Sequence, residues 1–97
     1  MNTSIHGYCD PAFQAVADAF ELNFSERGEV GASVSVSKDG EIVVDLWGGT
    51  ADVATGTPWQ EDTVSIVYSC TKAATALCAQ ILIDRGELDL DGLICDV

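Results

Sequence analysis

The residues best able to do chemistry are a serine and a lysine three positions apart, in the run Ser69-Cys70-Thr71-Lys72. On a helix this spacing places both side chains on one face, within reach of each other. A serine hydroxyl needs a neighbouring base to act as a nucleophile at neutral pH. A lysine amine can be that base while it is uncharged, and burial among apolar or small neighbours would disfavour its charged form. The pattern predicts a serine nucleophile paired with a lysine base.

A helix beginning at Ser69 would assist this chemistry. Apolar residues recur at helical spacing from about Ser69 to Arg85, and Gly86 can close the helix. The N-terminus of a helix favours developing negative charge, so the backbone N–H of Ser69 is a candidate donor to an oxyanion. The same residues also fit an ordinary N-cap followed by a solvated lysine. The lack of an acidic residue between Lys72 and Asp84 favours the catalytic interpretation.

Two further elements precede this helix. Asp10 and Pro11 predict the start of an N-terminal helix, whose apolar stripe begins at Phe13 and which Gly28 can end. Alternating residues over 32–37 and an apolar run over 42–47 predict a hairpin joined by a type I′ turn at Asp39-Gly40. We expect glycines 48 and 49 to end the return strand, a loop over 50–62 and a short extended segment over 63–68. The return strand is expected to be buried on both faces.

Composition limits the classes of function. The chain has 97 residues, the size of one small domain, and 16 acidic residues against 4 basic ones give a net charge of −12. Such acidity disfavours binding to nucleic acid and to anionic membrane surfaces. No apolar run approaches the roughly 18 residues of a membrane span, and the first ten residues do not resemble a secretion signal. We therefore expect a cytoplasmic protein.

The four cysteines are Cys9, Cys70, Cys78 and Cys95. No secretion signal indicates an oxidising compartment, and Cys70 and Cys78 are too far apart on one helix to form a disulfide. Buried free thiols are therefore expected. The single histidine and the absence of a Cys-x-x-C pair disfavour a metal site, and residues 89–92 lack the further ligands of a calcium loop. We expect neither a metal nor a cofactor, although a metal or redox protein using the cysteines is a third alternative.

The run from Ile66 to Lys72, the alanine-rich segment after it and the run from Arg85 to Asp91 resemble the start of the β-lactamase-related serine hydrolases. This superfamily includes class C β-lactamases, penicillin-binding D,D-peptidases and family VIII carboxylesterases. The resemblance extends from about Phe13 to Asp91. It implies an α+β, partial β-lactamase/transpeptidase-like fold. It also implies that Ser69 is acylated, that Lys72 is its base, and that the substrate is a small-molecule ester, amide or β-lactam, with the cytoplasmic esterases favoured.

The chain also departs from the family pattern. The family's Tyr-x-Asn motif is missing, because neither Tyr8 nor Tyr68 is followed by asparagine at the required position. The family's third motif is a Lys-Thr-Gly-like or Gly-Gly-containing strand that supplies the other oxyanion donor. The sequence Trp47-Gly48-Gly49 resembles it but precedes Ser69 rather than following it. We therefore expect residues 1–97 to be the N-terminal portion of a single β-lactamase-related domain whose remainder is absent from this chain.

A fragment of this kind has consequences for stability and for activity. A two-stranded hairpin alone is marginal in water, so we expect the isolated chain to be poorly stable, to self-associate or to act with the remainder of the catalytic domain. Its own hydrolytic activity is expected to be low. The alternative is a truncated, non-catalytic acidic protein or an interaction module with no activity alone.

Overall fold

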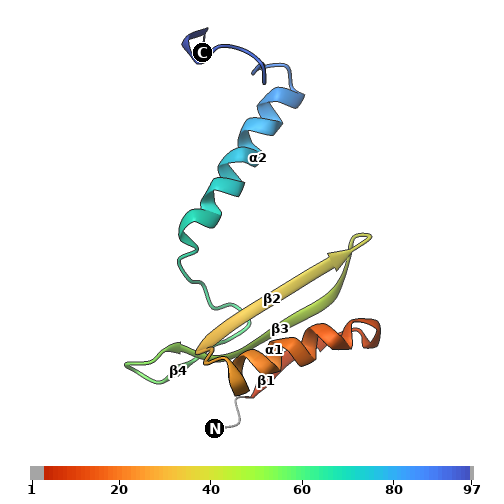
Figure 1. Cartoon of the computed structure of the whole chain (residues 1–97), viewed down its shortest axis with the longest axis vertical. Coiled ribbons are helices and arrows are strands. Elements are labelled where there is room, and N and C mark those ends of the chain that lie inside the picture. Colours follow the sequence, from red (N-terminus) through yellow and green to blue (C-terminus); the bar gives the residue numbers. More distant parts are fainter. Residues whose placement is uncertain (1–3, 97) are drawn as a thin grey trace. The chain divides into compact units, whose positions relative to one another are not determined.

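The computed structural model describes residues 4–96, which divide into two compact units on either side of the Val64–Ser65 bond (Figure 1). The first unit contains an antiparallel sheet and a helix, and the second contains one long helix with short 3₁₀ turns. The predicted α+β class and partial β-lactamase-like fold are confirmed, the latter by the structural matches reported below.

The sheet of the first unit has the strand order β1 (Ile5–Cys9), β3 (Glu41–Asp52), β2 (Gly31–Lys38), and β4 (Thr57–Pro58) pairs with the far end of β3. The expectation of a lone two-stranded hairpin was wrong, because β1 pairs antiparallel with the other edge of β3. His6 of β1 lies directly opposite Trp47, and their rings stack with centroids 6.5 Å apart. A third strand gives the hairpin the additional partner that independent stability requires.

The turn of the hairpin confirms the predicted geometry. Asp39 and Gly40 both have positive φ angles, of 53° and 85°, as a type I′ turn requires. The two strands stay in register from Gly31 to Val36, and a bulge between Val36 and Ser37 precedes the turn. The local sequence was sufficient here because Gly adopts these backbone angles without steric cost and Asp tolerates them.

One face of the sheet packs against α1 (Gln14–Glu26), which follows a 3₁₀ turn, η1 (Pro11–Phe13). The Asp10 carboxylate caps this turn by accepting the Ala12 N–H at 2.8 Å. The core consists of Phe20 from the helix with Val44 and Leu46 from β3. Contrary to the prediction of burial on both faces, β3 alternates, with Val44, Leu46 and Gly48 buried and their neighbours only partly buried.

Glycines 48 and 49 do not end β3, which continues to Asp52, and β4 lies within the segment expected to be a loop. The reason is close packing between backbones. Gly31 lies against Thr50 and the ring of Trp59, where a Cβ atom would come within 2.2 Å of the Thr50 carbonyl oxygen. The Trp59 N–H donates to the Gly49 carbonyl at 2.9 Å, which holds the chain after β4 against the end of β3.

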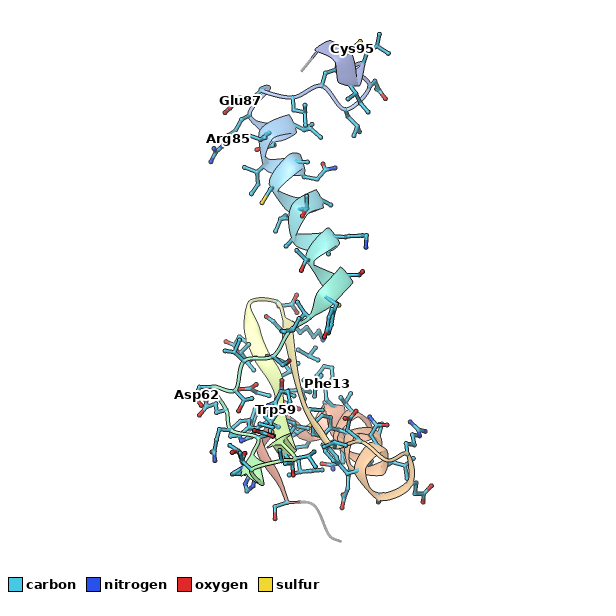
Figure 2. The ribbon with its side chains drawn as sticks, turned by 90° about the vertical axis from the view of Figure 1, so that its left-hand side faces the viewer. Phe13, Trp59, Asp62, Arg85, Glu87 and Cys95 are labelled. Atoms are coloured by element: carbon cyan, nitrogen blue, oxygen red, sulfur yellow. The ribbon has the colours of Figure 1, made fainter. Side chains whose placement is uncertain are left out.

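The second unit contains η2 (Tyr68–Cys70), α2 (Thr71–Asp84) and η3 (Ile94–Asp96). Gly86, with a φ of 72°, ends α2 as predicted. Figure 2 labels its two neighbours, Arg85 and Glu87. The Glu87 N–H donates to the Leu82 carbonyl at 2.9 Å. Within this unit α2 is almost uncovered, since only Ala79 and Ile83 of its residues are half-buried.

No helix among residues 4–96 is long and apolar enough to cross a bilayer. Cys9, Cys70 and Cys78 are free thiols. The expected burial was wrong for Cys70 and Cys78, which are exposed because residues 65–96 contain no layer packed over α2.

Candidate active site

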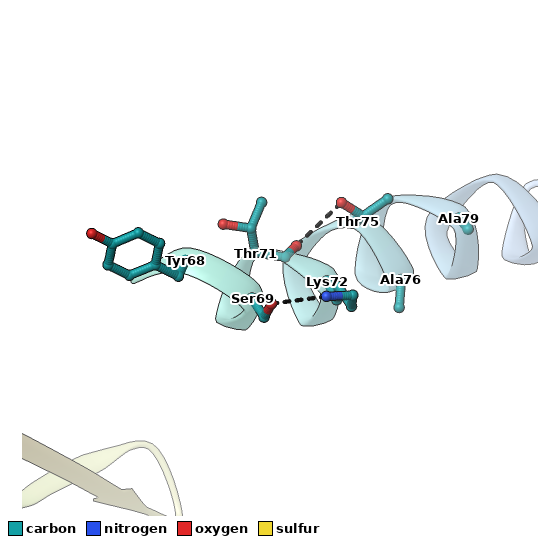
Figure 3. A pocket seen from close by; sticks show the side chains of 7 residues that line it. All are labelled: Tyr68, Ser69, Thr71, Lys72, Thr75, Ala76 and Ala79. Carbon is teal, nitrogen blue, oxygen red and sulfur yellow. Dashed lines mark hydrogen bonds between the residues drawn. The ribbon is translucent and has the colours of Figure 1, made fainter. Parts of the chain in front are cut away.

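The structure brings the predicted pair together in the second unit. The Lys72 Nζ donates a hydrogen bond to the Ser69 Oγ at 2.9 Å (Figure 3). Ser69 lies in the middle of η2 and Lys72 in the first turn of α2, so the two side chains project from consecutive turns of one continuous helical segment. This separation is within the 2.6–3.2 Å over which a base can take a proton. The contact follows directly from the three-residue spacing.

The geometry rejects the interpretation of Ser69 as an ordinary N-cap. Val67 is the N-cap residue of η2 and Cys70 that of α2, and neither makes a side-chain capping bond. Among the described contacts, the Ser69 hydroxyl bonds only to Lys72 rather than to a backbone N–H. The Ser69 N–H lies in the first turn, where helix N–H groups have no intrahelical acceptor. Hydroxyl, amine and an available backbone donor therefore come from four consecutive residues.

The backbone immediately before the nucleophile candidate is unusual. Tyr68 has a φ of 47°, in the left-handed region that non-glycine residues seldom occupy. The Cys70 N–H donates to the Val67 carbonyl at 3.1 Å and closes a tight turn around Tyr68 and Ser69. No pattern of residue types predicted this feature, because tyrosine has no preference for positive φ.

The expected burial of Lys72 is not met within this unit. Lys72 and its small neighbours Cys70, Ala73, Ala74 and Ala76 are all exposed. The sequence correctly indicated an apolar environment along the helix, but residues 65–96 contain no layer packed over it. Apolar neighbours on one helix desolvate an amine only when another element excludes water from the same side.

An open hollow runs along the helix face that carries the pair. Its lining consists of Ser69 and Lys72 together with Tyr68, Thr71, Thr75, Ala76 and Ala79 (Figure 3). The Thr75 hydroxyl donates to the Thr71 carbonyl at 3.1 Å, so it is engaged with the backbone of its own helix. The alanines leave space beyond Lys72. Tyr68 and Thr71 also line this hollow, and the hydroxyl and amine that bond to each other there are those of Ser69 and Lys72.

Comparison with known proteins identifies the family of this chain. The family model described as "Beta-lactamase" matches residues 13–96, which is most of the chain. The chain belongs to the beta-lactamase family. This confirms the superfamily resemblance inferred from the residues around Ser69 and from the order of the elements.

Two curated relatives of this beta-lactamase-family chain have "esterase" in their names. It is 38% identical over 92 residues to the esterase/beta-lactamase LipL of Mycobacterium tuberculosis, covering 95% of this chain and 21% of that protein. It is 42% identical over 72 residues to the esterase EstB of Burkholderia gladioli, covering 74% of this chain and 18% of that protein. The chain thus spans about a fifth of the length of these curated relatives.

Solved structures give the same result for the fold. A family VIII carboxylesterase matches 96% of this beta-lactamase-family chain with a TM-score of 0.90 and 45% sequence identity. A penicillin-binding protein homologue from Caulobacter crescentus matches the same share with a TM-score of 0.89 and 42% identity. In both cases the chain corresponds to 25% of the solved chain.

Other groups considered from the sequence do not form a site among the residues that the structure describes. Over 4–96, no cluster of three or more His, Cys, Asp or Glu residues is arranged to hold a metal ion. The Asp89 carboxylate accepts the Asp91 N–H at 3.0 Å, so this acidic segment forms a local turn. Gly48 belongs to the central strand, where a Cβ atom would come within 2.9 Å of the Ser4 carbonyl oxygen, which is a structural reason for glycine there.

Proposed function

We propose that this chain carries the nucleophile of a serine hydrolase that acts through an acyl-enzyme, with Ser69 as the acylated residue and Lys72 as its general base. The observation that carries the proposal is the 2.9 Å contact between the Lys72 Nζ and the Ser69 Oγ at the start of a helical segment. Membership of the beta-lactamase family supports it, since a nucleophile with an adjacent base is the arrangement that acyl transfer requires.

The chemistry proceeds in two halves. An uncharged Lys72 amine takes the Ser69 hydroxyl proton as the Oγ attacks the substrate carbonyl carbon, and the carbonyl oxygen becomes an oxyanion. The Ser69 N–H donates one hydrogen bond to that oxyanion. The intermediate collapses by breaking the C–O bond of an ester, or the C–N bond of an amide or lactam, and the Lys72 ammonium returns the proton to the leaving group. In the second half, the uncharged Lys72 amine takes a proton from water as the water oxygen attacks the acyl carbon. The bond between that carbon and the Ser69 Oγ then breaks, and the Lys72 ammonium returns the proton to the Oγ.

An ester is the first substrate class to test. The names of both curated relatives contain "esterase", and one solved relative is a family VIII carboxylesterase. A β-lactam or amide is the second class, because LipL is named an esterase/beta-lactamase and the other solved relative is a penicillin-binding protein homologue. The same nucleophile and base serve both classes, since each presents an acyl carbon with a departing oxygen or nitrogen.

We further propose that residues 1–97 form one part of a single β-lactamase-related domain rather than a complete catalytic domain. The family match runs continuously over 13–96 and therefore includes elements from both compact units. The near-complete exposure of α2 within its own unit fits the same proposal. The 97-residue chain alone is then expected to turn over p-nitrophenyl esters poorly, and robust turnover by it contradicts this proposal.

A fluorophosphonate probe tests the catalytic proposal, because it phosphonylates an activated serine stoichiometrically. The full-length gene product is labelled, digested and analysed by mass spectrometry, with Ser69→Ala beside it and Ser65→Ala as the matched control. We expect one label per chain at Ser69, none in Ser69→Ala and full labelling in Ser65→Ala. A folded protein that takes up no label at Ser69 rejects the hydrolase and leaves the non-catalytic interaction module as the better account.

A further inference from the structure

Tyr68 adopts a backbone conformation that the rest of its unit does not explain. Over residues 4–96 only two non-glycine residues, Asp39 and Tyr68, have positive φ angles. The angle at Asp39 is required by its hairpin turn. Tyr68 has a φ of 47°, although a side chain at such an angle crowds the following carbonyl group. A conformation of this kind persists only where the surrounding structure imposes it, and such conformations concentrate at functional sites.

The contacts of the Tyr68 ring do not account for the angle. The side chain is 79% exposed, and no hydrogen bond to its hydroxyl is formed within the described chain. The backbone around it is ordered instead: the Cys70 N–H bonds to the Val67 carbonyl across the turn, and regular α-helix begins at Thr71. The constraint therefore lies in the path of the chain from Val67 into the helix.

This path determines where Ser69 points. Val67 has a φ of −99° and a ψ of 2°, whereas Cys70 is already helical at −58° and −22°. Tyr68 lies between these two residues of negative φ, and its positive φ turns the chain directly before Ser69, whose Oγ reaches Lys72. If Tyr68 had an ordinary negative φ, the peptide that leads into Ser69 would rotate, and both the Oγ and the N–H of Ser69 would move with it.

We infer that Tyr68 is a positioning residue: its left-handed backbone aims the Ser69 hydroxyl at the Lys72 amine and leaves the Ser69 N–H exposed to the oxyanion. The inference rests on the proposed function. It assigns the effect to the backbone angle and not to the aromatic side chain, so residues that tolerate positive φ should replace tyrosine, whereas β-branched residues should not.

The test compares five forms of the full-length gene product: wild type, Tyr68→Phe, Tyr68→Asn, Tyr68→Gly and Tyr68→Val. The readouts are the rate of fluorophosphonate labelling at Ser69 and the separate kcat and KM for a p-nitrophenyl ester. We expect Tyr68→Phe, Tyr68→Asn and Tyr68→Gly each to be labelled at least roughly tenfold faster than Tyr68→Val, which is β-branched at a position of positive φ. Tyr68→Val should lower the labelling rate and kcat by at least roughly tenfold relative to wild type, because small displacements of a nucleophile are costly, with a smaller change in KM.

The outcomes separate this inference from the proposed function. Absence of labelling in the wild type rejects the proposed function. Labelling of the wild type with equal losses in Tyr68→Asn, Tyr68→Gly and Tyr68→Val assigns the effect to the ring and overturns the inference. Labelling of Tyr68→Val at the wild-type rate overturns it as well.

Thermal unfolding provides a second measurement if the valine variant does not fold. At a left-handed position glycine is more stable than alanine, the reverse of the usual order. Tyr68→Gly is therefore expected to melt above Tyr68→Ala. The opposite order shows that the residue does not hold a positive φ in the folded protein and overturns the inference.

Discussion

The most informative perturbation of the proposed site is Lys72→Arg. Arginine keeps a positive charge and hydrogen-bond donors near Ser69, but its guanidinium cannot accept a proton at accessible pH. The substitution therefore removes the base while it keeps the charge. Lys72→Ala removes both, so the two variants together separate proton transfer from electrostatic stabilisation.

The expected loss follows from the contacts of the serine. Among the described residues, the Lys72 Nζ at 2.9 Å is the one side-chain group bonded to the Ser69 Oγ, so no other described group can take over its role as base. General-base catalysis contributes about 10²–10⁴ in rate, which is about 3–5 kcal/mol in the activation barrier. We expect both Lys72→Arg and Lys72→Ala to lose acylation rate within that range.

The assay is the second-order rate of fluorophosphonate labelling of the full-length gene product, supported by steady-state turnover of a p-nitrophenyl ester. Lys38→Arg, at the hairpin turn, is the matched control because the chain contains only these two lysines. Thermal unfolding of each variant is measured beside the assay, so that a loss of folded protein is not counted as a loss of the base. Retention of the wild-type labelling rate by Lys72→Arg within threefold would refute the reasoning, because a charge alone would then suffice.

Three further predictions concern the first unit. Leu46→Ala, at a core position that is 5% exposed, should lower the free energy of unfolding by about 2–5 kcal/mol in denaturant titration, whereas Ser35→Ala on the opposite face should change it little. Gly31→Ala should lower the melting temperature and shift the NMR signals of the amides of residues 31 and 50, because its Cβ would come within 2.2 Å of the Thr50 carbonyl oxygen. An unchanged melting temperature contradicts the close approach. The Thr55 side chain, with the Ala54 N–H, holds the pKa of the Asp52 carboxyl below its usual range. The resulting stabilisation is present above the unfolded-state pKa and is lost as pH falls through the folded-state value, so an NMR titration of Asp52 at or above the ordinary aspartate pKa contradicts it.

The exposure of α2 connects the fold to the proposed function. A lysine base needs an environment that disfavours its charge, and the described unit supplies small, apolar neighbours without a covering layer. The pair is thus assembled geometrically within one unit, while its desolvation depends on contacts beyond that unit. This is the physical reason for expecting little turnover from the 97-residue chain alone.

The sequence by itself determined the features that depend on neighbouring residues. The Asp39-Gly40 turn, the Asp10 cap, the end of α2 at Gly86 and the contact between Ser69 and Lys72 each arise within a few positions of the chain. Backbone preferences and helical spacing act over this range, so residue type was sufficient to predict them.

Tertiary structure alone decided the features that depend on distant partners. Strand β1 was missed because Gly7 weakens its pattern and its pairing with β3 joins segments far apart in the sequence. The extension of β3 past Gly49 depends on the close approach of Gly31 and Trp59. Gly49 was expected to end the strand, but a Cβ atom there would come within 2.2 Å of the Val30 carbonyl oxygen, so packing requires glycine. The exposure of Lys72 and the left-handed angle at Tyr68 likewise arise from what surrounds each residue and from the path of the chain. Residue type does not encode either one, because the elements packed around a residue determine whether water is excluded from it and which backbone angles it can adopt.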